Sequence, residues 1–173
     1  MPLQRKSDLL VAPAGEAALI FVVALAGWAA HQPLIFTSLG PTAYELIETP
    51  ERGSACTYNI MVGHLTGVAA GFLAVWVTGA RWAPQVSAAG VPWVRVWAAV
   101  LATALTVVGT LALRASQPAA LSTTLLIALG KMQRWQDALV IMAAVVIVTA
   151  VGQPIRHVRL RRIKEAKDRE SKR

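Results

Sequence analysis

Long stretches without a single charged residue constrain this chain more than any other feature of its sequence. No Asp, Glu, Lys or Arg occurs between Glu16 and Glu45 or between Arg52 and Arg81, and shorter charge-free stretches follow as far as Arg156. Crossing the roughly 30 Å hydrocarbon core of a bilayer takes about 20 apolar residues in an α-helix. With 55% hydrophobic and only 15% charged residues, the chain cannot be a soluble globular enzyme, a disordered protein or a disulfide scaffold. It is predicted to be a polytopic membrane protein.

Four apolar segments are long enough to span a membrane, and two others are shorter. We predict an all-α membrane protein with a cytoplasmic N-terminus (1–8), a transmembrane domain (9–155) and a basic cytoplasmic tail (156–173). The predicted spans cover residues 9–30, 58–79, 93–113 and 136–152, the last ending before Pro154. The short segments, 33–47 and 118–130, are rich in Pro, Gly, Ser and Thr, and we expect them to be re-entrant or half-helix segments enclosed by the bundle.

The distribution of basic residues predicts the orientation. Of the 17, nine lie after Gln153, and with four spans this tail shares its side with the basic residues Arg5, Lys6, Arg81 and Arg95. The positive-inside rule then places both termini in the cytoplasm. The tryptophans are expected in two belts, with Trp76, Trp82, Trp93 and Trp97 at inner ends and Trp28 and Trp135 at outer ends. The tail, which dominates the net charge of +8, is expected to contact anionic lipid headgroups and not nucleic acid.

The two halves of the chain resemble each other in the order of their elements. Each half runs through a span, a Gln-Pro pair, a short segment and a second span, with the pairs at Gln32-Pro33 and Gln117-Pro118. This order predicts an internal two-fold repeat. If the short segments return to the side from which they enter, the two repeats are parallel and not inverted.

No arrangement of residues indicates an enzyme or a metal centre. The chain lacks the common nucleophile, zinc-protease, thiol-pair and phosphate-loop motifs. Its three histidines are dispersed, and the lone Cys56 has no partner for a disulfide. We therefore expect no catalytic residues, no bound metal and no cofactor.

The two short segments are the strongest candidates for function. Ser38, Gly40 and Thr42, with Pro41 among them, are typical of a helix start, at which Pro takes the first helical position and a hydroxyl caps the helix. In the second segment, hydroxyl side chains cluster at Ser122, Thr123 and Thr124. A helix that begins inside a membrane protein directs N–H groups and the positive end of its dipole inward, which suits a small anion. The alternative is that both segments are ordinary loops outside the membrane.

The second span combines small and polar residues. Gly63, Gly67 and Gly71 are spaced four apart, which predicts a face for close helix packing, and Asn59 extends this face. Packing is favoured over direct lining of a solute path. His64 lies within the same span, where an ionisable residue suggests a role in transport or gating; a neutral histidine bonded between helices is the alternative.

Two blocks of this sequence resemble the HPP family of small four-span membrane proteins. The first block holds His31-Gln32-Pro33, Ser38-Leu39-Gly40, Asn59 and Gly63-His64, and the second holds Gln117-Pro118, Ser122-Thr123-Thr124 and Gln136-Asp137-Ala138. The resemblance covers about residues 9–160, although the motif that names the family reads His-Gln-Pro here in place of His-Pro-Pro. Some members are associated with nitrite transport, so the resemblance implies a membrane transporter or channel with nitrite as its substrate.

Two functions of different classes follow as hypotheses. The first is a transporter or channel for a small anion, in which the two short segments form the selective constriction, and Asn59 and His64 line or support it. The second is a scaffold or sensor without transport, whose basic tail binds lipid or a partner. The expected location is a bacterial plasma membrane, and a homo-oligomer stays open as an alternative to a monomer.

Overall fold

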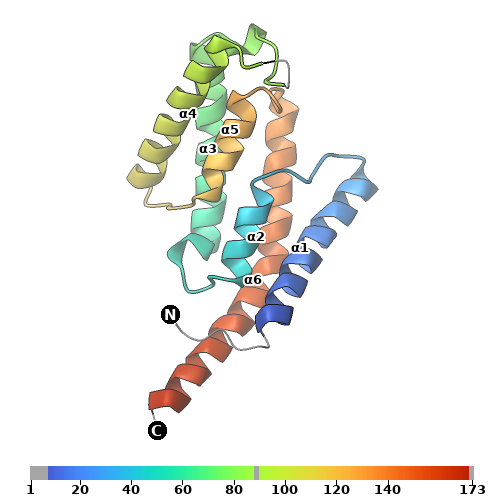
Figure 1. The fold of residues 1–173 in the computed structure, drawn as a ribbon, viewed down its shortest axis with the longest axis vertical. Helices are drawn as coiled ribbons and strands as arrows, with labels where there is room; N and C mark the ends of the chain where they lie inside the picture. Colours follow the sequence, from blue (N-terminus) through green and yellow to red (C-terminus); the bar gives the residue numbers. More distant parts are fainter. Residues whose placement is uncertain (1–7, 88–89, 172–173) are drawn as a thin grey trace.

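A computed structural model describes residues 8–87 and 90–171, and within that range the regular structure is entirely helical (Figure 1). The elements in chain order are α1 (Asp8–Ala30), α2 (Leu39–Ile47), the 3₁₀ turn η1 (Gly53–Ala55), α3 (Thr57–Val77), the 3₁₀ turn η2 (Ala80–Trp82), α4 (Trp93–Ala112), α5 (Ala119–Ala128) and α6 (Trp135–Ser171). Among the described residues, α1, α3, α4 and α6 are long and apolar enough to cross a membrane. The all-helical architecture with four spanning helices is therefore confirmed.

The long helix α6 does not end at Pro154, contrary to the prediction. Proline lacks the N–H that would continue the helical ladder, but α6 runs through it to Ser171. The turn around Pro154 is held from outside the helix, because Gln153 donates to Ala55 O at 2.7 Å and Arg156 donates to Pro50 O at 2.9 Å. The basic tail therefore continues the last span as one helix over its described residues.

The segment that contains the short helix α2 runs from one end of the helix bundle to the other and does not form a hairpin. The chain enters from the end of α1 that carries Trp28, and α2 finishes near the opposite end of α1, where Ile47 Cγ2 would lie 3.5 Å from a Cβ on Gly15. The side of the molecule at which α1 begins and α6 ends is called the terminal face below, and the opposite side is called the distal face. Residues 31–38 thus lead inward from the distal face, and α2 continues to the terminal face (Figure 1).

The second short helix, α5, runs in the opposite direction. It is entered from the carboxyl end of α4 at the terminal face, and it ends at the distal face, where Val86 donates its N–H to Leu129 O at 3.0 Å. Both short segments therefore contain half-helices that run toward opposite faces of the bundle, and neither turns back as a hairpin. The helix Ala119–Ala128 fits the predicted half-helix.

The two halves are related as inverted repeats. In the first half α1 and α3 run toward the distal face, whereas α4 and α6 of the second half run toward the terminal face (Figure 1). Each half-helix packs against the first long helix of its own half and the last long helix of the other: α2 on α1 and α6, α5 on α4 and α3. A shift of 81 positions relates Gly71 to Gly152 and Leu46 to Ile127. Each glycine packs against the large side chain of the other half, Gly71 against Ile127 and Gly152 against Leu46.

This inversion corrects the predicted parallel repeat and changes which residues share a side. Parallel repeats followed from the assumption that the short segments return to their own side, and they do not. All six tryptophans consequently lie toward the distal face, at one end of their elements: Trp28, Trp76, Trp82, Trp93, Trp97 and Trp135. Arg81 and Arg95 also belong to the distal face, while Arg52 and Arg114 join the basic tail at the terminal face. Arg5 and Lys6 lie outside the described residues.

Candidate functional site

The amino ends of the two half-helices meet in the interior of the molecule, beside α3. Ser38 directly precedes α2, and its Oγ lies 2.8 Å from Thr123 Oγ1 in the second turn of α5. This hydrogen bond joins residues that are 85 positions apart. Since α2 runs from this point to the terminal face and α5 to the distal face, the positive ends of both helix dipoles point toward one region.

His64 of α3 completes this meeting point. Its Nε2 lies 3.1 Å from Thr42 Oγ1 of α2, and its Nδ1 lies 2.8 Å from Thr123 Oγ1 of α5. Thr42 and Thr123 are related by the same shift of 81 positions as the packed glycines, so the ring lies between equivalent side chains of the two repeats. Ser38, Thr42, His64 and Thr123 are each 0% exposed; these four residues are called the hydroxyl–histidine layer below.

The layer accommodates both protonation states of the ring. Thr42 donates its hydroxyl hydrogen to Ser38 O at 2.9 Å, so toward His64 Nε2 it can only accept. If Thr123 donates to Ser38 Oγ, it also accepts from Nδ1, and the arrangement fits the imidazolium ion. If the two hydroxyls are turned the other way, Thr123 donates to Nδ1 and the arrangement fits the neutral ring. Passage between these patterns takes the gain or loss of one proton at Nδ1, together with rotation of two hydroxyl groups.

A second contact fixes α5 against α3 and α4. Thr124 Oγ1 lies 2.7 Å from Thr106 Oγ1 of α4 and 3.2 Å from Gly67 O of α3. Along α3, Gly67 and Gly71 face α5 and Gly63 faces the segment that leads into it, and a Cβ on Gly67 would lie only 2.7 Å from Ala120 O. The glycine face therefore brings the backbones of α3 and α5 together, and it positions Thr123 against His64.

Besides Thr124, three of the residues predicted to line the path lie outside this layer. Gly40 is exposed, with nothing within 4 Å of a Cβ placed on it. Asn59 donates to Gly53 O at 2.7 Å, so its side chain fastens η1 at the start of α3 and does not extend the layer. Ser122 is half-buried on α5. The cap of α2 also differs from expectation, because Ser38 makes no side-chain capping bond and Pro41 is the third residue of the helix.

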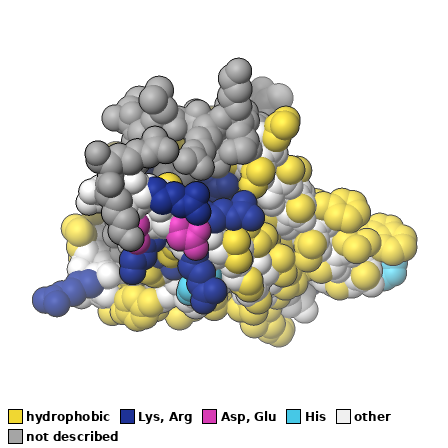
Figure 2. Space-filling view, turned by 90° about the horizontal axis from the view of Figure 1, so that it is seen from below, with side chains coloured by type: hydrophobic (Ala, Val, Ile, Leu, Met, Phe, Trp, Pro, Cys, Tyr) yellow, Lys and Arg dark blue, Asp and Glu magenta, His cyan; other side chains and the backbone are white. Residues whose placement is uncertain are grey.

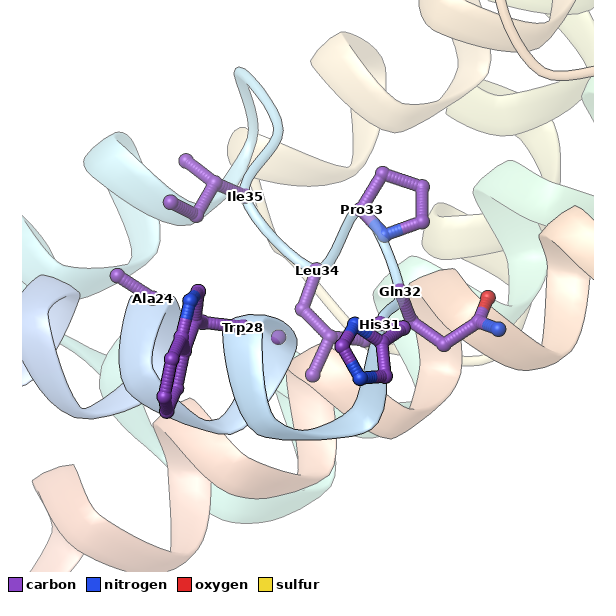
Figure 3. Close-up of a pocket in the computed structure, with 8 residues that line it drawn as sticks. Ala24, Trp28, His31, Gln32, Pro33, Leu34 and Ile35 are labelled. Carbon is purple, nitrogen blue, oxygen red and sulfur yellow. The ribbon is translucent and has the colours of Figure 1, made fainter.

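The His31-Gln32-Pro33 motif lies at the distal end of α1, away from the layer. His31 has φ +50°, and Gln32 donates its N–H back to Gly27 O at 2.9 Å, which closes the helix. The motif lines a hollow of about 390 Å³ with Trp28 and Leu34 (Figure 3). The motif residues themselves are exposed.

The counterpart of His31 in the second half is Arg114, and not a residue of the second Gln-Pro pair. Arg114 has φ +51°, and Ala115 donates to Thr110 O at 2.8 Å, so α4 ends in the same way as α1. Gln117 is buried, in contrast to Gln32, and Pro118 directly precedes α5. The two Gln-Pro pairs are therefore not structurally equivalent, although the repeat that they suggested is present in the helix arrangement.

Arg95 is buried, although the sequence indicates it only as one of the basic residues that set the orientation. Its guanidinium donates to Pro84 O, Ala83 O and Gln133 Oε1, and to Ala128 O in the last turn of α5. It is 0% exposed. A cation beside the carboxyl end of a helix is stabilised by the helix dipole, so Arg95 anchors the distal end of α5. Its position in line with the buried small residues Ala98, Ala102 and Thr106 of α4 is the signal that could have revealed it.

A comparison with protein families matches the chain over nearly its whole length. The model of the HPP transmembrane region covers residues 1–164. The chain belongs to the HPP family. It is accordingly an integral membrane protein, and the resemblance drawn from its two sequence blocks is confirmed. No curated protein and no solved structure matches this HPP family chain.

Proposed function

We propose that this HPP family protein is a transporter or channel for a small monovalent anion, with nitrite as the first substrate to test. The observation that carries the proposal is the meeting of two half-helix amino ends at the buried hydroxyl–histidine layer. Inverted repeats with interrupted helices whose amino ends point at the centre are typical of transporters that bind anionic groups there. Hydroxyl groups replace part of the hydration shell of an anion, and the dipoles favour negative charge without a buried lysine or arginine.

The layer is closed in this structure, because all four of its side chains are fully buried. Passage of an ion therefore requires that α2 and α5 separate at the bond between Ser38 and Thr123. An arriving anion would take the place of this bond and accept hydrogen bonds from the freed hydroxyls and from His64. Nitrite is small, planar and a good acceptor at each oxygen, which matches donors that converge from two sides.

Flux into proteoliposomes tests this proposal. Purified protein should admit nitrite faster than empty liposomes do, and nitrate, formate and chloride should be compared under the same gradient. The expected result is flux of nitrite or of another small monovalent anion that is at least 10-fold above empty liposomes. Flux equal to that of empty liposomes for all four anions would contradict the proposal.

A second candidate function concerns the basic tail, which lies at the terminal face. The tail helix carries basic side chains beyond the apolar part of α6, and Figure 2 shows dark-blue side chains gathered on this face. One of them, Lys167, lies 2.7 Å from Glu51 Oε1. We propose that the remaining basic side chains bind anionic lipid headgroups. Removal of residues after His157 should weaken binding to vesicles that contain an anionic lipid and leave anion flux intact; loss of a protein partner instead would favour the scaffold function.

A further inference from the structure

A second buried polar group lies between the hydroxyl–histidine layer and the terminal face. Glu45 follows Thr42 by one turn of α2 and is 6% exposed, and its Oε2 has no hydrogen-bond partner among the described residues. Gln117, which precedes α5, is 4% exposed, and both its Nε2 and Oε1 lack a partner in the same sense. The side chains of Gln117 and Ser54 lie beside the Glu45 carboxyl group.

The position of Gln117 is fixed closely. A Cβ on Gly63 would lie 2.5 Å from Gln117 Cβ, so the absence of a side chain at Gly63 is what allows Gln117 to enter this space. Gln117 O also accepts the N–H of Ala120 at 3.0 Å in the first turn of α5. A change at the Gln117 side chain therefore bears directly on the amino end of the half-helix that carries Thr123.

The side-chain atoms of Glu45 and Gln117 that lack hydrogen-bond partners indicate what this pair binds. A carboxylate and an amide oxygen repel one another, and buried polar atoms without partners are costly. A proton on Glu45 removes both difficulties, since the acid O–H can donate to Gln117 Oε1 while Gln117 Nε2 donates to the other carboxyl oxygen. One proton thus satisfies every orphaned atom of the pair.

The ligand supply favours a proton over a metal cation, because no group of three or more His, Cys, Asp or Glu side chains that could hold a metal ion occurs among the described residues. Arg52, from the segment before η1, is the cation whose charge acts on Glu45, and it opposes a proton and a metal ion alike. Glu48 at the end of α2 and Glu16 of α1 repel each other, and Arg156 of α6 donates to Pro50 O and Gln153 Oε1. His64 and Tyr58 are the titratable groups of α3 on this side, and α5 has none.

We propose that Glu45, held by Gln117, binds the proton that travels with the anion. The proposal rests on the proposed anion transport, and it makes the protein a proton-coupled transporter and not a simple channel. Protonation would close the Glu45–Gln117 pair and draw α2 and the start of α5 together on the terminal side.

Coupling is tested in proteoliposomes that carry a pH-sensitive dye and an inward nitrite gradient without sodium. The wild-type protein should acidify the lumen as nitrite enters. Glu45→Gln should reduce the acidification at least 10-fold, and Glu48→Gln, which changes a half-buried neighbour, should leave it unchanged. Acidification by Glu45→Gln at the wild-type rate, or a requirement for sodium, would overturn the proposal.

A measurement that does not depend on transport separates this proposal from the proposed function. Infrared difference spectra of the detergent-solubilised protein should contain a protonated carboxyl band at neutral pH that disappears in Glu45→Gln and persists in Glu48→Gln. In Gln117→Leu the band should move to higher frequency because the acid loses its hydrogen-bond partner. If no such band occurs, the proton site is refuted even where nitrite flux is found; if the band occurs without flux, only the proposed transport fails.

Discussion

His64 shows how much a single residue in this fold depends on partners that are distant in the sequence. Its two ring nitrogens contact threonines from different half-helices, at 3.1 Å and 2.8 Å. The sequence identifies His64 as a polar residue within a span, and it identifies Thr42 and Thr123 as parts of hydroxyl-rich segments. It does not indicate that the three meet, because this depends on the direction in which each half-helix enters the bundle.

The close contact of single glycines on α3 with α5 predicts how a substitution there affects stability. Gly67→Ala should lower the free energy of unfolding by about 1–3 kcal/mol, because the new methyl group would meet Ala120 O at 2.7 Å and Thr124 Oγ1 at 2.8 Å. The measurement is the midpoint of thermal unfolding in detergent.

Gly40→Ala is the matched control for that substitution. Nothing lies within 4 Å of a Cβ at this position, and alanine favours a helix over glycine by about 0.5–1 kcal/mol. The control should therefore unfold at the wild-type temperature or above it. Equal midpoints for the two variants would show that α3 and α5 are not in close backbone contact.

At the scale of elements, each short helix has contacts at both of its ends, and those at the outer end anchor it. Their amino ends meet at the layer, and the carboxyl end of α5 is held by Arg95 through Ala128 O at 3.1 Å. The carboxyl end of α2 lies near the segment that Arg156 and Gln153 hold against α6. A half-helix anchored at its outer end can move at its inner end without leaving the bundle.

The anchoring of α5 predicts a strong effect of Arg95→Met. The substitution leaves three backbone carbonyls, of which that of Ala128 is buried, and Gln133 without their donor, so the free energy of unfolding should fall by about 2–4 kcal/mol. Arg81→Met is the control, since Arg81 is exposed and its guanidinium lies 4.3 Å from the ring centre of Trp82. Denaturation curves for the two variants should differ clearly; a control as unstable as Arg95→Met would refute the anchoring role.

The elements also show where sequence reasoning succeeds. The long spans and the short apolar segments follow from charge and hydropathy alone, because a bilayer imposes a minimum length on any helix that crosses it. The end of α6 was misplaced because the contacts that support the turn at Pro154 come from residues 50–56, about 100 positions earlier. The directions of α2 and α5 were misjudged for a related reason: a short apolar segment does not reveal on which side it emerges.

For the whole molecule, inversion of the two halves is the main change from the predicted architecture. It gathers the tryptophans at the distal face and leaves most basic residues at the terminal face. The positive-inside rule still predicts a cytoplasmic terminal face, although the residues that support this prediction are different. Arg81, predicted on the cytoplasmic side, lies on the distal side in the structure. Arg52 and Arg114 lie at the terminal face instead and now support its cytoplasmic location.

This topology predicts a pattern of chemical labelling. In a Cys56→Ser background, Arg81→Cys and Lys131→Cys should react with a membrane-impermeant maleimide from one side of the membrane. Arg114→Cys and His157→Cys should react from the other. Parallel repeats would instead place Arg81→Cys on the same side as His157→Cys, and that result would contradict the inverted arrangement.

The hydroxyl–histidine layer is the central claim, and nitrite flux through Thr42→Val, Thr123→Val double-substituted protein tests it most directly. Valine keeps the shape of threonine and removes the hydroxyls that face His64. The control is Thr149→Val, whose buried hydroxyl in α6 donates to Val145 O of its own helix at 2.6 Å and has no other partner in the described part of the chain. The account predicts that the double substitution lowers flux at least 10-fold while the control stays within about 2-fold of wild type. Flux through the double-substituted protein equal to that of the control would contradict it.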